Sequence, residues 1–237
     1  MPQTPEPATP DASQTDWKGF AIDLLLYLAV MFAIRQVQFS QVGFIANGLF
    51  WSMSTLLVAM WRMKARGVTW KELGLTRPAR FRSTIFATLF ILLLAPALII
   101  GFEILKDALS LQLDADTSNE DAVSKFGDLA GNWGLFLTIM PFVLLQSTLE
   151  ELLDRGFMIH WLERAFSNTS VATILAVILQ AAIFGFRHSY DLSSRSITVG
   201  LIGLTMGIAY VAFGRNLWPL IIAHCALNTM SMVDRVV

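Results

Sequence analysis

Seven stretches of the chain carry almost no formal charge, and each is about long enough to cross a lipid bilayer. They are residues 18–34, which contain Asp23, and the charge-free residues 36–61, 83–102, 129–149, 165–186, 196–214 and 216–233. A helix rises about 1.5 Å per residue, so about 20 residues span a hydrocarbon core of about 30 Å. The alternating pattern of a membrane β-barrel is absent. The sequence predicts an all-α, polytopic membrane helical bundle with about seven transmembrane helices.

Composition supports a membrane protein and excludes several other classes. Of 237 residues, 55% are hydrophobic and 15% are charged, whereas soluble domains are about 25% charged. A net charge of −1 argues against a nucleic-acid partner, which requires a concentrated basic surface. The single Cys225 excludes an intrachain disulfide framework and a multi-cysteine zinc site. The expected partner is the lipid bilayer.

Charges outside the apolar stretches predict domain organisation and orientation. Residues 1–17 are rich in proline and contain no basic residue before Lys18, so we expect a disordered tail followed by a single transmembrane domain, 18–237. Residues 62–82 hold seven basic residues and one acid, whereas 103–128 hold seven acids and two lysines. The positive-inside rule then places the N-terminus in the cytoplasm. Short turns and the plain tail suggest a prokaryotic plasma membrane. A helix-start pattern occurs at 117–121.

Four charged residues directly follow the apolar stretch 129–149, namely Glu150, Glu151, Asp154 and Arg155. Each charge costs about 2.5–3.5 kcal/mol at the centre of a bilayer. Glu151 and Arg155 are four apart on a helix, so they are expected to form a structural ion pair. Glu150 is not served by that pair, and Asp154 lies one turn beyond it on nearly the same face. Glu150 is therefore the candidate general base.

Three histidines are available as partners for Glu150. His160 lies in a polar, amphipathic continuation of the fourth span, where interfacial packing is the expected role. His188 ends the next span, and His224 lies inside the last one, with Asn228 one turn further on the same face. Polar groups inside a membrane need partners, and such a pair points to a functional site. If the fourth helix turns near Asn168, Glu150 and His188 reach nearly the same depth.

These residues resemble the three motifs of the CAAX prenyl protease family of intramembrane endopeptidases, also called the CPBP or Abi group. Two glutamates, three residues and an arginine are found at 150–155, followed by Gly156. Phe-x-x-x-His is found at 184–188, and His-x-x-x-Asn at 224–228. The resemblance covers about residues 130–232, which would be the catalytic core. The glycines Gly203 and Gly207 within it are spaced for close helix packing.

The resemblance implies an enzyme that hydrolyses a peptide bond of a membrane-associated peptide or protein. It implies that Glu150 and His188 activate a water, while His224 and Asn228 stabilise the oxyanion of the tetrahedral intermediate. Glu151 and Arg155, together with Asp154, would support this site from behind. No cofactor is expected. The alternative is a zinc ion on Glu150, His188 and His224, because catalytic zinc commonly has three protein ligands.

The sequence departs from the family pattern at Asp154, where a large apolar residue is usual, and Arg187 beside His188 could compensate that charge. Two other classes of protein use intramembrane charges and stay open at this point. One is a proton-coupled transporter. The other is a catalytically silent membrane scaffold or immunity protein of the same fold.

Overall fold

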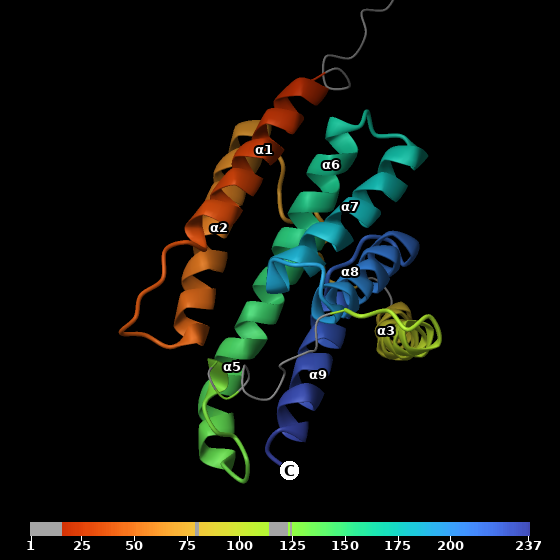
Figure 1. The fold of residues 1–237 in the computed structure, drawn as a ribbon. Coiled ribbons are helices and arrows are strands. Elements are labelled where there is room, and N and C mark those ends of the chain that lie inside the picture. The colour runs from red at the N-terminus through yellow and green to blue at the C-terminus, as the bar shows by residue number, and fades with distance from the viewer. Residues whose placement is uncertain (1–15, 79–80, 114–122, 124) are drawn as a thin grey trace, which may run out of the picture.

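The computed structural model describes residues 16–78, 81–113, 123 and 125–237, in which all extended regular structure is helical. The helices are α1 (Trp17–Ile34), α2 (Phe44–Arg66), α3 (Phe81–Ala108), α5 (Trp133–Glu150), η2 (Glu151–Met158), α6 (Ile159–Ala165), α7 (Ser170–Ser189), α8 (Ser194–Ala212) and α9 (Trp218–Asp234). Figure 1 shows α1 and α2 side by side along one flank of the bundle, with α3 on the opposite flank. The expected all-α fold is confirmed.

The outer surface of the bundle is apolar. Large side chains that are more than half exposed recur along the helices, among them Leu57, Phe86, Leu93, Ile104, Leu137 and Val171. Contiguous exposed apolar surface on this scale is characteristic of contact with lipid. Six helices are long and apolar enough to cross a membrane when Trp133–Ala165 is taken as one. With the 17 residues of α9, the bundle matches the expected number of about seven spans, and the chain is an integral membrane protein.

The charge that interrupts the first apolar stretch is satisfied by α2. Asp23 is 2% exposed and accepts from Arg62 at 2.7 Å and from Arg66 at 2.6 Å. Arg66 also pairs with Asp16, whose side chain caps the start of α1. Helix α1 therefore begins at Trp17, inside the segment 1–17 expected to be a tail. The rest of that segment and the expected helix start at 117–121 lie outside the described residues.

The second span begins eight residues later than the sequence predicted. Residues 36–61 were expected to be helical, but α2 starts at Phe44. The Asn47 amide is the reason, because it accepts from the Phe39 backbone N–H and donates to the Phe39 and Val42 carbonyls. Trp51 Nε1 donates to the Val37 carbonyl at 2.8 Å. These bonds hold the preceding residues in a loop folded against the first turns of α2.

The fourth span is one continuous helical rod of 33 residues, Trp133–Ala165, whose middle part is π-helical at η2. It ends in a turn in which Ser167 and Asn168 have positive φ, and Thr169 caps α7. The turn expected near Asn168 is confirmed, while the span expected to start at Ala165 starts at Ser170. Figure 1 shows α6 and the start of α7 extending beyond the turn between α8 and α9.

Glycines bring α7 and α8 into backbone contact. A Cβ on Gly185 would lie 2.9 Å from the Gly200 Cα, and one on Gly207 would lie 2.9 Å from a Val177 methyl. A Cβ on Gly203 would lie 3.1 Å from the Phe184 ring. The close packing expected of Gly203 and Gly207 is confirmed. It fixes the end of α7, which carries the second motif.

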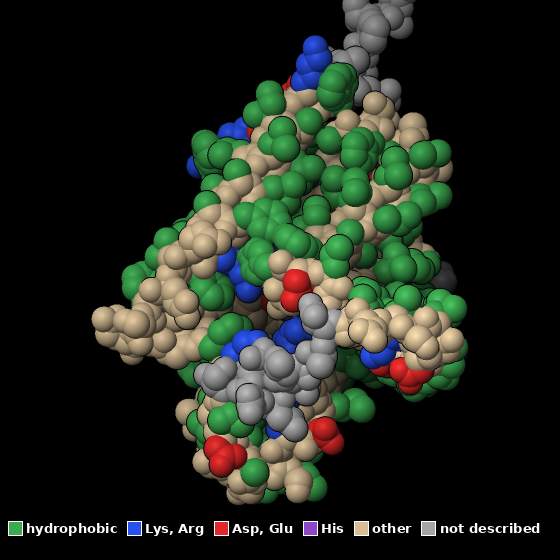
Figure 2. Space-filling view, viewed as in Figure 1, with side chains coloured by type: hydrophobic (Ala, Val, Ile, Leu, Met, Phe, Trp, Pro, Cys, Tyr) green, Lys and Arg blue, Asp and Glu red, His purple; other side chains and the backbone are tan. Residues whose placement is uncertain are grey.

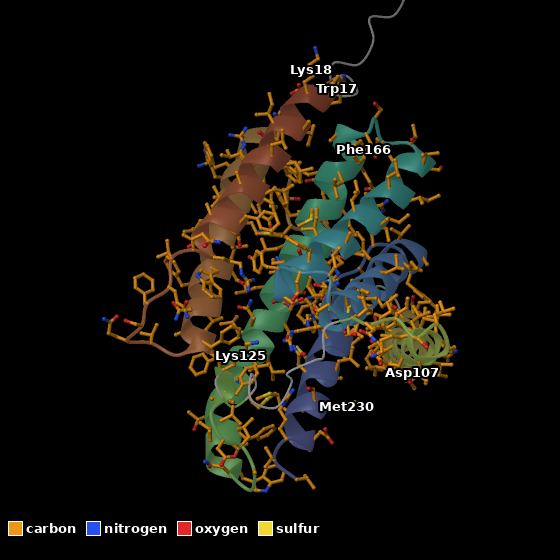
Figure 3. All side chains as sticks on the ribbon, in the orientation of Figure 1. Trp17, Lys18, Asp107, Lys125, Phe166 and Met230 are labelled. Carbon is orange, nitrogen blue, oxygen red and sulfur yellow. The ribbon has the colours of Figure 1, made fainter. Side chains whose placement is uncertain are left out.

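Several helix ends lie at two opposite ends of the molecule, whereas α3 lies across one flank. Figure 3 shows Trp17, Lys18 and Phe166 at one end and Lys125 and Met230 towards the other. The loop after α2 lies at the first end, where the Leu217 backbone N–H donates to the Gly74 carbonyl at 3.0 Å. Gly156 of η2 packs against Leu73 of this loop. The basic loop thus lies at the end opposite to the C-terminal ends of α7 and α9.

Candidate active site

A cavity of about 750 Å³ lies between the helices, and all four residues expected to be catalytic line it. Glu150 ends α5, His188 lies in the last turn of α7, and His224 and Asn228 lie on α9. The structure therefore brings together residues that are up to 78 positions apart in the chain. The prediction that Glu150, His188, His224 and Asn228 converge on one cavity is met.

Glu150 is held by an amide rather than by a cation. Gln146 Nε2 donates to Glu150 Oε1 at 3.1 Å and to Ser52 Oγ of α2 at 2.7 Å. The other carboxylate oxygen, Oε2, lies 3.7 Å from His224 Nε2. An acceptor that is oriented by a neutral donor keeps lone pairs for a further proton donor, as a general base requires.

His224 is oriented by the second glutamate of the pair. Its Nδ1–H donates to Glu151 Oε1 at 2.6 Å, and Arg155 donates to the same oxygen at 3.0 Å. Glu151 and Arg155 are both completely buried, so the expected structural ion pair is confirmed. A carboxylate bound to one nitrogen of a histidine fixes the ring orientation and leaves the other nitrogen for the site. Glu151 thus links the ion pair to His224, a contact that spacing in the sequence does not predict.

His188 is fixed by its own helix. Its Nδ1–H donates to the Phe184 carbonyl, four residues earlier, at 2.6 Å. In the neutral form, this bond leaves the Nε2 lone pair as an acceptor. The Phe184 and His188 rings are 4.5 Å apart, and Phe184 itself is buried. The spacing in Phe-x-x-x-His therefore corresponds to a backbone carbonyl and a ring that together orient the imidazole.

Asn228 is oriented by α5. Its Nδ2 donates to Ser147 Oγ at 2.8 Å, and the Ser147 hydroxyl donates in turn to the Val143 carbonyl. One Nδ2 hydrogen of Asn228 is thus committed to Ser147, while the amide has a second hydrogen to donate. Ser147 lies four residues before Glu151, so a single face of the α5–η2 rod supports both polar residues of α9.

Asp154 does not line the cavity but forms a buried ion pair behind it. Arg187 donates to Asp154 Oδ2 at 2.7 Å, which confirms that Arg187 compensates the unusual acid. The guanidinium carbons of Arg155 and Arg187 lie 4.3 and 5.3 Å from the centre of the Phe184 ring. These distances are in the cation–π range. Phe184 thereby contacts both buried cations.

Two other expectations from the sequence concern His160 and a possible metal site. His160 lies on α6, with its ring 5.7 Å from that of Trp161, and it does not line the cavity. The described residues contain no group of three or more His, Cys, Asp or Glu side chains arranged to hold a metal ion. Zinc on Glu150, His188 and His224 stays an untested alternative.

Three residues that position Glu150 and Asn228 were not predicted from the sequence, namely Gln146, Ser147 and Ser52. A signal existed for the first two, because they precede Glu150 and Glu151 by four residues on the same helix. No signal existed for Ser52, whose partner lies 94 positions away. The partner of Asp154 lies 33 positions away and was found only because Arg187 is an unusual charge beside a motif histidine.

Fold and site define a polytopic membrane protein with a partly buried carboxylate, two oriented histidines and an amide around one cavity. Residues 132–230 match the family model described as type II CAAX prenyl endopeptidase, Rce1-like. This match confirms the resemblance to the CAAX prenyl protease family over that part of the chain. No curated protein and no solved structure gives a significant match to the chain.

Proposed function

We propose that the protein is an intramembrane endopeptidase that hydrolyses a peptide bond of a membrane-associated peptide or protein. The observation that carries the proposal is the position of Glu150 beside His224 at 3.7 Å, in a cavity that His188 and Asn228 also line. The matched family is one of endopeptidases. A cavity between membrane helices can admit an extended substrate peptide. The polar side chains that line it would otherwise be surrounded by lipid.

Hydrolysis requires a water, a base and donors for the developing negative charge. In the proposed reaction, Glu150 takes a proton from the water while the His188 Nε2 lone pair accepts the second O–H, and the water oxygen attacks the carbonyl carbon. The new oxyanion accepts from Asn228 Nδ2–H and, when His224 is doubly protonated, from its Nε2–H. Each such donor contributes about 10²–10³ in rate. The C–N bond then breaks, and the amine leaves with the proton held by Glu150.

The supporting residues fix the orientation of the catalytic side chains. Gln146 holds the Glu150 carboxylate, Glu151 holds His224, and Ser147 holds Asn228. A zinc ion, if bound, would take Glu150 and the histidines as ligands and would supply an activated water. Metal analysis of the purified protein, together with activity before and after chelation, separates the two versions of the site.

The experiment that tests the function compares peptides in membranes that contain wild-type protein with those that contain Glu150→Gln. The amide keeps the shape and the bond from Gln146 but cannot take a proton from water. New peptide termini are expected with wild type and not with the variant. An identical set of termini in both samples would refute the role of Glu150. A second control, His160→Gln, should behave as wild type.

A further inference from the structure

The cavity has a cationic mouth in addition to its catalytic groups. Besides Arg187, which is paired with Asp154, three arginines line it from three separate elements: Arg35 follows α1, Arg195 lies in the first turn of α8, and Arg235 follows α9. We call these three residues the arginine rim. Figure 2 shows Lys and Arg side chains beside a hollow near the middle of one face, and Lys125, which also lines the cavity, is labelled in Figure 3.

The charges of the rim are not used within the described part of the chain. The ion pairs found there join other residues, and none includes Arg35, Arg195 or Arg235. Arg35 stacks on the Trp51 and Tyr190 rings, with its guanidinium carbon 4.8 and 5.2 Å from their centres. Burial lowers the pKa of Arg35. The buried Arg195 Nε has no hydrogen-bond partner among these residues. Cations that have no counterion among the described residues and lie in a partly buried mouth attract an anion.

The carboxylate of Asp191, which lines the cavity with the rim, already accepts hydrogen bonds. Asp191 accepts from the Ser193 hydroxyl at 2.6 Å and from the Ser193 backbone N–H at 3.1 Å. These bonds hold the pKa of Asp191 below its usual value. Asp191 and Glu150 are the two carboxylates among the described lining residues. Glu150 belongs to the catalytic group, and neither carboxylate forms an ion pair with a rim arginine in the described part of the chain.

Arg195 lies at an electrostatically unfavourable position, and a bound anion would offset this cost. An arginine in the first turn of a helix opposes the positive end of the helix dipole, and Arg195 is the second residue of α8. The orientation expected from the basic loop places this end of the molecule outside the cytoplasm, where Lys and Arg are normally depleted. Both facts favour a role for the rim in binding an anion rather than in stability or topology.

The catalytic groups lie within reach of the same anion. The charge of Arg35 interacts with Glu150, and both residues line the one cavity with apolar side chains such as Phe44, Trp51 and Leu227. An extended peptide advances about 3.3–3.6 Å per residue. A group bound at the rim is therefore only a few residues from the bond at Glu150.

We propose that the arginine rim binds a carboxylate of the peptide substrate, within a few residues of the bond that is cleaved. The protein then selects apolar peptide segments that carry an acidic group on one side of that bond. This proposal rests on the proposed function, because it names the substrate class of the same site. Charge complementarity argues for a peptide carboxylate, and an anionic lipid headgroup is the competing occupant.

The test uses the full-length protein in vesicles of phosphatidylcholine, which carry no net charge. The probes are peptides that share one apolar sequence and differ by a single Glu or Gln at each position near the centre, with cleavage located by mass spectrometry. The Glu peptide with the correct position should have a higher kcat/KM than its Gln partner, mainly through KM. Arg35→Gln, Arg195→Gln and Arg235→Gln should each lower that kcat/KM about two- to fivefold and leave the Gln peptide unchanged.

Controls separate charge from shape and from folding. Arg195→Lys should retain most of the discrimination, and Arg77→Gln, in the exposed loop at the other end, should retain all of it. Peptides with an amidated C-terminus show whether the bound carboxylate is a side chain or the chain end. Melting temperatures of the variants report folding.

Two results would overturn the inference. One is cleavage that depends on Glu150 but is equal for Glu and Gln peptides, which would leave the proposed function intact. The other is a rim effect that occurs only with phosphatidylglycerol in the vesicles and is equal for both peptides, which would identify a lipid headgroup as the occupant. Absence of any cleavage, or cleavage unchanged by Glu150→Gln, would instead refute the proposed function.

Discussion

Replacing Glu151 is expected to damage the fold and the site together. Glu151 Oε1 accepts from Arg155 at 3.0 Å and from His224 at 2.6 Å, and both members of the ion pair are completely buried. Glu151→Ala leaves the Arg155 charge without a carboxylate in a low-dielectric interior. Breaking such a pair costs about 3–5 kcal/mol, which corresponds to a decrease in melting temperature of about 6–20 °C for a protein of this size.

The measurement is thermal unfolding of purified Glu151→Ala followed by tryptophan fluorescence. Glu103→Ala is the matched control, because Glu103 pairs with Lys106 one turn away on α3 but is 42% exposed in its side chain. It should cost no more than about 0.5 kcal/mol. The double variant Glu151→Ala with Arg155→Met should recover much of the lost stability, since an apolar replacement removes the unpaired charge. A Glu151→Ala protein with the melting temperature of wild type would refute the reasoning.

Three further predictions concern the pair behind the cavity, the helix contact and the orientation. Asp154→Phe should destabilise the protein by about 3–5 kcal/mol because Arg187 loses its carboxylate, and adding Arg187→Leu should restore most of the melting temperature; no loss in the single variant would contradict this. Gly185→Ala should be destabilising by about 1–3 kcal/mol through overlap with α8, whereas Gly101→Ala, with open space around its Cβ, should be neutral or stabilising. Asp191→Cys, in a variant whose single native cysteine is replaced, should react with an impermeant maleimide from outside intact cells; labelling only after lysis would reverse the orientation.

The order and number of the helices could be predicted from the sequence because the bilayer imposes a length and forbids unpaired charge. The same reasoning found the Glu151–Arg155 pair, since residues four apart on a helix must be neighbours. It failed at the start of α2, where residues 36–43 are as apolar as a helix but are held in a loop by Asn47 and Trp51. Hydropathy carries no information about such side-chain bonds to the backbone.

The residues of the site were predicted from the sequence, but the hydrogen bonds between them were not. Spacing within a helix cannot show that Glu151 of η2 would meet His224 of α9, or that Ser147 would orient Asn228, because those contacts depend on how helices far apart in the chain pack. The π-helical geometry of η2, a feature frequent at functional sites, also has no signal in the charge pattern. The rim arginines lie in loops and at helix ends, on three separate elements. Helical spacing in the sequence therefore cannot predict that they line the same cavity.

Hydrolysis by purified protein in water enriched in ¹⁸O tests the central claim most directly. Wild-type protein should cut an apolar, acidic peptide and place one solvent oxygen in the new C-terminal carboxylate, as detected by mass spectrometry. Glu150→Gln, folded with the melting temperature of wild type, should give no product above background. Product formation by this variant at the wild-type rate, with the same incorporation of solvent oxygen, would contradict the assignment of Glu150 as the base.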